Sequence, residues 1–144
     1  LGVCAGAYAI SSGYDWSMSL INYELVDKKN AHRGEAVMPF ELTKAGMKLL
    51  RIKDGNLPSI YYHNGPVWKI FDSEKENTST VLATFKEDIY AEAGTAGQAS
   101  GTPAIIYDKF GIGKVMAISP HFEKSLGYEY VIDKVIRFLT NGKK

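Results

Sequence analysis

The sequence predicts an α/β domain, and three observations support that prediction. Residues 103–108 and 113–119 are clear strands, and the glycine-containing linker between them favours a hairpin. A C-terminal helix is indicated by apolar residues at spacings of three and four: Tyr128, Val131, Ile132, Val135, Ile136 and Leu139. The length of 144 residues suits one core rather than two. A single domain over residues 1–144 is therefore expected.

The first third of the chain is expected to contain two short helices, one strand and a loop. Residues 5–12 are small and apolar and fit a short buried helix, while residues 22–27 favour a strand. The mixed segment 31–40 is expected to be a loop. Thr43 is a suitable N-cap for a helical turn over residues 45–50, because its hydroxyl can accept a hydrogen bond from a free backbone N–H.

The middle of the chain is expected to be rich in strands. Four segments have a β-type composition: residues 48–53, 59–63, 66–71 and 79–85. Turns are indicated between them at Asp54-Gly55-Asn56 and at Asn64-Gly65. Residues 92–102 are rich in glycine, alanine and serine, which predicts a loop. Asn141-Gly142 is expected to end the last helix.

The charge balance gives no reason to expect a nucleic-acid or membrane partner. The chain has 17 basic and 16 acidic residues, so its net charge of +1 creates no long-range field. No apolar run reaches the roughly 18 to 20 residues that span a bilayer. The single cysteine excludes an internal disulfide framework and a multi-cysteine metal cluster. No signal peptide is visible, and a cytoplasmic location is the default expectation.

The single cysteine lies among small residues in Gly2-Val3-Cys4-Ala5-Gly6-Ala7. A nucleophile at the tip of a sharp strand-to-helix turn has a strained backbone, and glycine at Gly2 and Gly6 would relieve the crowding around it. The helix that follows is expected to favour the Cys4 thiolate through its dipole and free N–H groups. The N–H of Ala5 would be one oxyanion-hole donor. The competing interpretation is a buried packing cysteine.

A second motif, Ser119-Pro120-His121-Phe122-Glu123, directly follows a predicted strand. In an extended stretch, residues two apart point to the same side, so Glu123 can lie beside His121 and stabilise its imidazolium. A cysteine nucleophile needs such a base, held by a third group. The alternative for any lone histidine is a surface or core residue, and that is what we expect for His32 and His63.

The two motifs together resemble the class I glutamine amidotransferase superfamily. The resemblance implies a flavodoxin-like three-layer sandwich in which Cys4 attacks a carboxamide, His121 acts as general base and then acid, and Glu123 orients His121. The thioester that forms would be hydrolysed by water. This chemistry requires neither a metal nor an organic cofactor, and its partner would be a small-molecule amide substrate.

A finer resemblance is to the amidotransferase-like N-terminal domain of biotin-protein ligases. The residues that carry it are Cys4-Ala5-Gly6-Ala7-Tyr8, Tyr62-His63-Asn64-Gly65-Pro66, and the ending from Gly113 to Glu123. It covers most of the chain. It implies an attached or partner synthetase or ligase domain.

The sequence departs from the superfamily pattern in two places. The residue four positions after the nucleophile is commonly glutamine and helps to form the substrate pocket, but here it is Tyr8. Gly6 and Tyr8 are therefore the expected pocket residues, and glutamine itself is put in doubt as the substrate. In the superfamily, βα units precede the elbow, so a further N-terminal segment of roughly 60 to 90 residues is expected before Leu1.

Three functions remain open from the sequence. The first is a cysteine hydrolase or transferase that acts on a carboxamide. The second is a catalytically inactive binding or regulatory domain of the same fold, which Tyr8 favours. The third is a peptidase or chaperone-like cysteine hydrolase, which ranks lower because those relatives often carry histidine where this chain has Ala5. Trp16 is a further candidate for the pocket wall, because it too follows the elbow.

Overall fold

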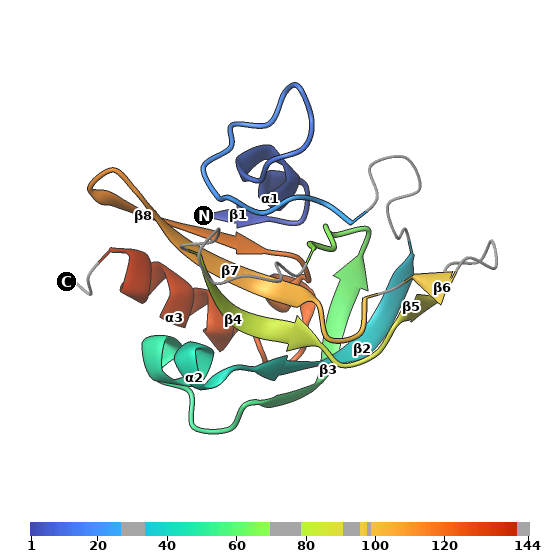
Figure 1. Ribbon diagram of the computed structural model, residues 1–144. Helices are drawn as coiled ribbons and strands as arrows, with labels where there is room; N and C mark the ends of the chain where they lie inside the picture. Colours follow the sequence, from blue (N-terminus) through green and yellow to red (C-terminus); the bar gives the residue numbers. More distant parts are fainter. Residues whose placement is uncertain (27–33, 70–78, 91–95, 98, 141–144) are drawn as a thin grey trace.

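The computed structural model describes residues 1–26, 34–69, 79–90, 96–97 and 99–140 (Figure 1). Over these ranges the chain forms a curled, mixed six-stranded sheet with three α-helices. The prediction of an α/β architecture is therefore confirmed. No helix in these ranges combines the length and the hydropathy that a membrane crossing requires.

The main sheet consists of β1 (Gly2–Val3), β2 (Glu35–Leu42), β3 (Asn56–His63), β4 (Thr80–Phe85), β7 (Pro103–Phe110) and β8 (Gly113–Ile118). Its strand order is β1-β8-β7-β4-β2-β3. β1 pairs with β8 in parallel, and every other pair of neighbours in the described sheet is antiparallel. Two short strands, β5 (Ile89–Tyr90) and β6 (Ala96–Gly97), form a separate antiparallel pair.

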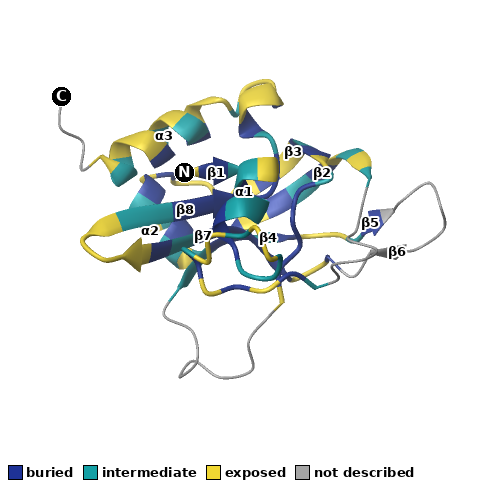
Figure 2. Ribbon diagram, turned by 90° about the horizontal axis from the view of Figure 1, so that it is seen from above, coloured by how far each residue is buried: buried dark blue, intermediate teal, exposed yellow. Residues whose placement is uncertain are grey.

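The helices lie on both faces of the sheet. α1 (Ala5–Ile10) packs on β1 and β8, whereas α2 (Lys44–Leu50) and α3 (Tyr130–Leu139) contact each other on the opposite face (Figures 1 and 2). A short 3-10 helix, η1 (Phe122–Lys124), lies between β8 and α3 in the chain.

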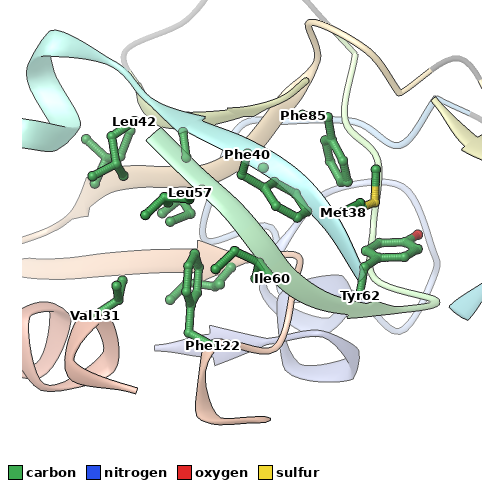
Figure 3. Close-up of a cluster of buried hydrophobic side chains, with 14 of the residues drawn as sticks. Met38, Phe40, Leu42, Leu57, Ile60, Tyr62, Phe85, Phe122 and Val131 are labelled. Atoms are coloured by element: carbon green, nitrogen blue, oxygen red, sulfur yellow. The ribbon is translucent and has the colours of Figure 1, made fainter. Parts of the chain in front are cut away.

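The two faces have separate apolar cores because successive strand residues point to opposite sides. Ile105, Met116 and Ile118 belong to the larger core, with Val131 and Val135 of α3. Figure 3 shows part of this core, where Phe40, Ile60, Phe85 and Phe122 converge. Ile106 and Ala117, one residue away on the same strands, pack instead with Ala7 and Ile10 of α1.

Several elements lie where the sequence predicts them. Thr43 caps α2, and its Oγ1 accepts a hydrogen bond from the N–H of Gly46 at 3.0 Å. The predicted helices near both ends correspond to α1 and α3. The predicted strands 59–63, 79–85, 103–108 and 113–119 correspond to β3, β4, β7 and β8, and the last two form the expected hairpin.

Two predictions of local structure are wrong. The segment 31–40 was expected to be a loop, but from residue 35 it is strand β2, which lies between β4 and β3 and in which Met38, Phe40 and Leu42 are buried at alternate positions. Pro39 obscures this alternation, and it lies where the pairing with β3 shifts register. The segment 48–53 was expected to be a strand, but its first half completes α2, which ends at Arg51 in the left-handed conformation.

Two further predicted strands form only isolated bridges in the described residues. Glu24 forms a single β-bridge with Ser12, and Leu25 forms one with Trp68. The segments 22–27 and 66–71 therefore make single β-bridges rather than continuous strand pairing. Residues 27, 70 and 71 lie outside the described ranges, as do His32, Asn141-Gly142 and most of 91–98. Within the predicted loop 92–102, residues 96–97 form β6.

Candidate functional site

Cys4 lies at a sharp turn between β1 and α1. Its backbone N–H donates to the carbonyl of Ile118 at 2.9 Å, which continues the parallel pairing with β8. Its own carbonyl accepts from the N–H groups of Ala7 and Tyr8, which begins α1. Between these contacts the Cys4 backbone has φ 49° and ψ −107°. A non-glycine residue at such an angle is strained, as in a nucleophile elbow.

The two glycines beside the elbow have different roles. A Cβ at Gly2 would lie 2.4 Å from the carbonyl oxygen of Gly6, so only glycine fits there. A Cβ at Gly6 would meet nothing within 4 Å. The expectation that both glycines relieve crowding is therefore right for Gly2 and wrong for Gly6, where an added Cβ would enter open space.

The thiol of Cys4 donates a hydrogen bond to the carbonyl oxygen of His63 at 3.2 Å. Burial raises the pKa of this thiol and is the largest influence on it. The N–H of Ala5 lowers that pKa, the Glu123 carboxylate raises it and the Lys124 ammonium lowers it. The expected stabilisation by Ala5 is present, but the net direction is opposite to the predicted thiolate, because desolvation outweighs it.

His121 and Glu123 form a close pair. His121 Nδ1 lies 2.6 Å from Glu123 Oε1, and the carboxylate side chain is 44% exposed. Phe122, between them, is fully buried in the larger core (Figure 3), whereas His121 is half-buried and Glu123 is exposed. The contact predicted between the two side chains is therefore present, whereas a catalytic role for them stays a prediction.

Ser125 fixes the backbone around His121. Its hydroxyl donates to the His121 carbonyl at 2.6 Å and accepts from the N–H of Tyr61 at 2.9 Å. The N–H of His121 donates to the Tyr61 carbonyl at 2.8 Å. The two bonds to Tyr61 join the segment after β8 to β3, and the bond between Ser125 and His121 holds that segment together. The Tyr61 ring lies 5.7 Å from the imidazole of His121.

The segment from Tyr62 to Pro66 forms a wall opposite the elbow. The hydroxyl of Tyr8 donates to the Asn64 carbonyl at 3.1 Å, and the hydroxyl of Tyr62 donates to the Gly65 carbonyl at 2.7 Å. A Cβ at Gly65 would lie 2.1 Å from the carbonyl oxygen of Ser119, so glycine allows this wall to pack against the end of β8.

Sequence reasoning missed the main-chain carbonyl of His63, which is part of the candidate site. The side chain of His63 is exposed, as predicted, but its main-chain carbonyl is the partner of the Cys4 thiol. Sequence patterns report side chains, so no signal identified this carbonyl. The only clue was that residues 62–66 carried part of the family resemblance.

The structure brings some of the predicted site residues together and leaves others apart. In the described part of the chain, the thiol of Cys4 bonds to His63 and His121 bonds to Glu123 through Nδ1, with no hydrogen bond joining Cys4 to His121. Trp16 is 60% exposed and stacks on Tyr14 at 5.0 Å. Among the described residues, no three His, Cys, Asp or Glu side chains gather as a metal site would need.

Comparison with known proteins identifies a family. No curated protein and no solved structure gave a match. The family model described as biotin-protein ligase, N terminal, matches residues 1–136. This range contains the elbow at Cys4, the wall at residues 62–66 and the pair His121 and Glu123. The chain therefore belongs to the biotin-protein ligase N-terminal domain family.

Proposed function

We propose that this domain is a cysteine-dependent hydrolase or transferase of the glutamine amidotransferase type that acts on the carboxamide of a small molecule. Cys4 is the nucleophile, His121 the general base and Glu123 the residue that orients it. The observation that carries this proposal is the backbone of Cys4, with φ 49° at a strand-to-helix turn. Strain of this kind at a non-glycine residue costs about 1–3 kcal/mol and is typical of functional sites.

In the proposed reaction, Nε2 of His121 accepts the thiol proton while Nδ1 stays on Glu123. The Cys4 sulfur attacks the amide carbon, and the N–H of Ala5 stabilises the oxyanion. The C–N bond then breaks, and the amine leaves with the proton from His121. Water, or an acceptor amine, attacks the thioester and restores the thiol. Before the first step, the thiol must leave the carbonyl of His63.

The proposed substrate pocket lies beside Gly6 and Tyr8. In this proposal, the open space at Gly6, two residues after Cys4, gives room for the acyl group. Tyr8 stands four residues after Cys4, where glutaminases commonly carry glutamine. Its hydroxyl is bonded to the Asn64 carbonyl, so in this proposal the tyrosine ring closes that side of the pocket. This arrangement favours an amide other than glutamine.

A flavodoxin-like three-layer sandwich is part of the same proposal. The placement of α1 on one face and of α2 and α3 on the other supports three layers. The parallel pairing of β1 with β8, with Cys4 directly after β1, supports an elbow of the amidotransferase type. The antiparallel pairs from β8 to β3 would then form one half of the sheet.

A second candidate is a binding or regulatory domain of the same fold without catalysis. Two observations favour it: burial raises the pKa of Cys4, and the thiol proton is held by a main-chain carbonyl. Both keep the sulfur in its neutral, weakly nucleophilic form. In this candidate, Cys4 would be a packing residue.

Acylation of Cys4 by p-nitrophenyl acetate at pH 7.5, followed by mass spectrometry, separates the two candidates. A general base contributes about 10²–10⁴-fold, so the enzyme proposal predicts that His121→Ala slows acylation at least about 100-fold. His63→Ala is the matched control, because it removes an exposed imidazole near the site and keeps the carbonyl that the thiol contacts. Equal rates in the wild type and His121→Ala would reject the enzyme proposal and support the binding domain.

A further inference from the structure

A cavity lies between α2, α3 and the start of β8. Its volume is about 510 Å³. Its lining combines five cationic with three apolar side chains: Lys48, Arg51, Lys114, Lys134 and Arg137, with Leu49, Leu50 and Phe138. None of the described residues that line it carries a carboxylate. Because the whole chain carries a net charge of only +1, this concentration of positive charge is local.

Nearby negative charge offsets only part of these cations. Asp133 pairs with Arg137 at 2.7 Å, and the Phe138 carbonyl accepts from Nζ of Lys114 at 2.8 Å. The C-terminal ends of α2 and α3 each contribute at most about half a negative charge.

The cavity is distant from the elbow. Lys114 lies near the start of β8 and Ile118 at its end, where Cys4 is attached. Ile118 lies four positions after Lys114 along the strand, a span of roughly 13 Å. α2 and α3 also lie on the sheet face opposite α1 (Figure 1). A ligand in this cavity would therefore not contact Cys4.

We propose that this cavity binds a small, free anion that carries one or more phosphate groups. A compact anion with two or more charges matches the five cationic side chains of the lining, and the planar guanidinium groups of Arg51 and Arg137 suit phosphate oxygens. Leu50 and Phe138 supply an apolar floor against which the rest of the molecule can pack. The site does not depend on the function proposed for Cys4.

Isothermal titration of the protein with pyrophosphate at constant ionic strength tests the proposal. Hydrogen bonds to charged groups are strong, so removing one cation is expected to weaken binding about tenfold. The test variants are Lys134→Gln and Arg51→Gln. Lys53→Gln is the matched control, because Lys53 is exposed two residues from Arg51 and does not line the cavity.

Thermal unfolding without any anion gives a second, independent measurement. The five cations repel one another when the cavity is empty, so Lys134→Gln should raise the melting temperature while it weakens pyrophosphate binding. A purely structural lysine would show the reverse. The proposal is overturned if pyrophosphate does not bind, if Lys134→Gln binds it as tightly as the wild type does, or if only anionic phospholipid vesicles bind.

Discussion

The sulfur of Cys4 and the carbonyl oxygen of His63 are 3.2 Å apart, and the thiol proton lies between them. The contact joins the elbow to the end of β3, across 59 positions of sequence. A thiol that donates to a carbonyl must be protonated, so this contact favours the neutral sulfur. It is therefore the feature that any base, including His121, has to displace before the sulfur can attack.

The neutral thiol predicts how stability changes with pH. Burial raises the pKa of Cys4 in the folded protein above the ordinary 9.0, whereas the unfolded chain keeps the ordinary value. The folded state then binds the proton more tightly. This contribution to stability is complete below pH 9.0 and is lost as the pH rises through the folded pKa.

Urea unfolding of the wild type and Cys4→Ser from pH 7 to pH 10.5 checks this prediction. Serine can still donate to the His63 carbonyl but does not titrate in this range. Tyrosines that titrate near pH 10 are present in both proteins, so their contribution to stability cancels in the comparison. We expect the wild type to lose stability relative to Cys4→Ser only above about pH 9. A relative gain for the wild type at high pH would show that the fold stabilises the thiolate.

The two glycines of the elbow should respond oppositely to alanine. Gly2→Ala places a Cβ 2.4 Å from the Gly6 carbonyl oxygen, and both are backbone atoms that cannot rotate away. We expect a loss of stability of about 1–3 kcal/mol or more, as in other overpacked sites. Gly6→Ala enters open space inside a helix and should gain up to about 1 kcal/mol.

Guanidinium unfolding of both variants measures these changes. Gly6→Ala also fills the proposed pocket, so under the enzyme proposal it should slow acylation of Cys4 while the fold becomes more stable. If Gly2→Ala were as stable as the wild type, the close approach of Gly2 to the Gly6 carbonyl would be wrong.

The parts of the fold that the sequence predicts are those with strong local signals. α3 has a regular apolar stripe, the β7–β8 hairpin has two apolar runs around glycine, and α2 has a threonine cap. β2 was missed because Pro39 interrupts its alternation, although it pairs with both β3 and β4. That pairing depends on partners distant in sequence, which a local pattern does not report.

The sequence likewise predicted some features of the candidate site and missed others. The elbow and the pair of His121 and Glu123 were found because side-chain types at fixed spacing identify them. The bond from Cys4 to a main-chain carbonyl and the raised pKa were not, since both result from tertiary packing. The cationic cavity was missed as well, because its side chains come from α2, α3 and β8 and no single segment is strongly basic.

The cap of α2 provides a test of local structure. Oγ1 of Thr43 accepts from the N–H of Gly46 at 3.0 Å and donates to the Val81 carbonyl at 2.8 Å. Thr43→Ala removes both bonds, and we expect it to destabilise the protein by about 1–2 kcal/mol. Thr43→Ser keeps the hydroxyl and should retain most of the stability. Urea unfolding of both variants measures the difference, and equal losses would mean that the methyl group, not the cap, is what matters.

Ser125 is predicted to support both the fold and the position of His121. It is 3% exposed, and its hydroxyl accepts from the N–H of Tyr61 while it donates to the His121 carbonyl. Ser125→Ala leaves the N–H of Tyr61 without this partner, which should destabilise the protein by about 1–3 kcal/mol. Ser59→Ala, at an exposed position of the same strand, is the matched control and should change little.

The same variant distinguishes a positioning role from a purely structural one. If Ser125 holds the backbone of His121 in place, then Ser125→Ala should slow acylation of Cys4 at a temperature where the variant is still fully folded. It should do so less than His121→Ala does, because the imidazole remains on Glu123. Acylation at the wild-type rate, together with the loss of stability, would limit Ser125 to joining β3 with the end of β8.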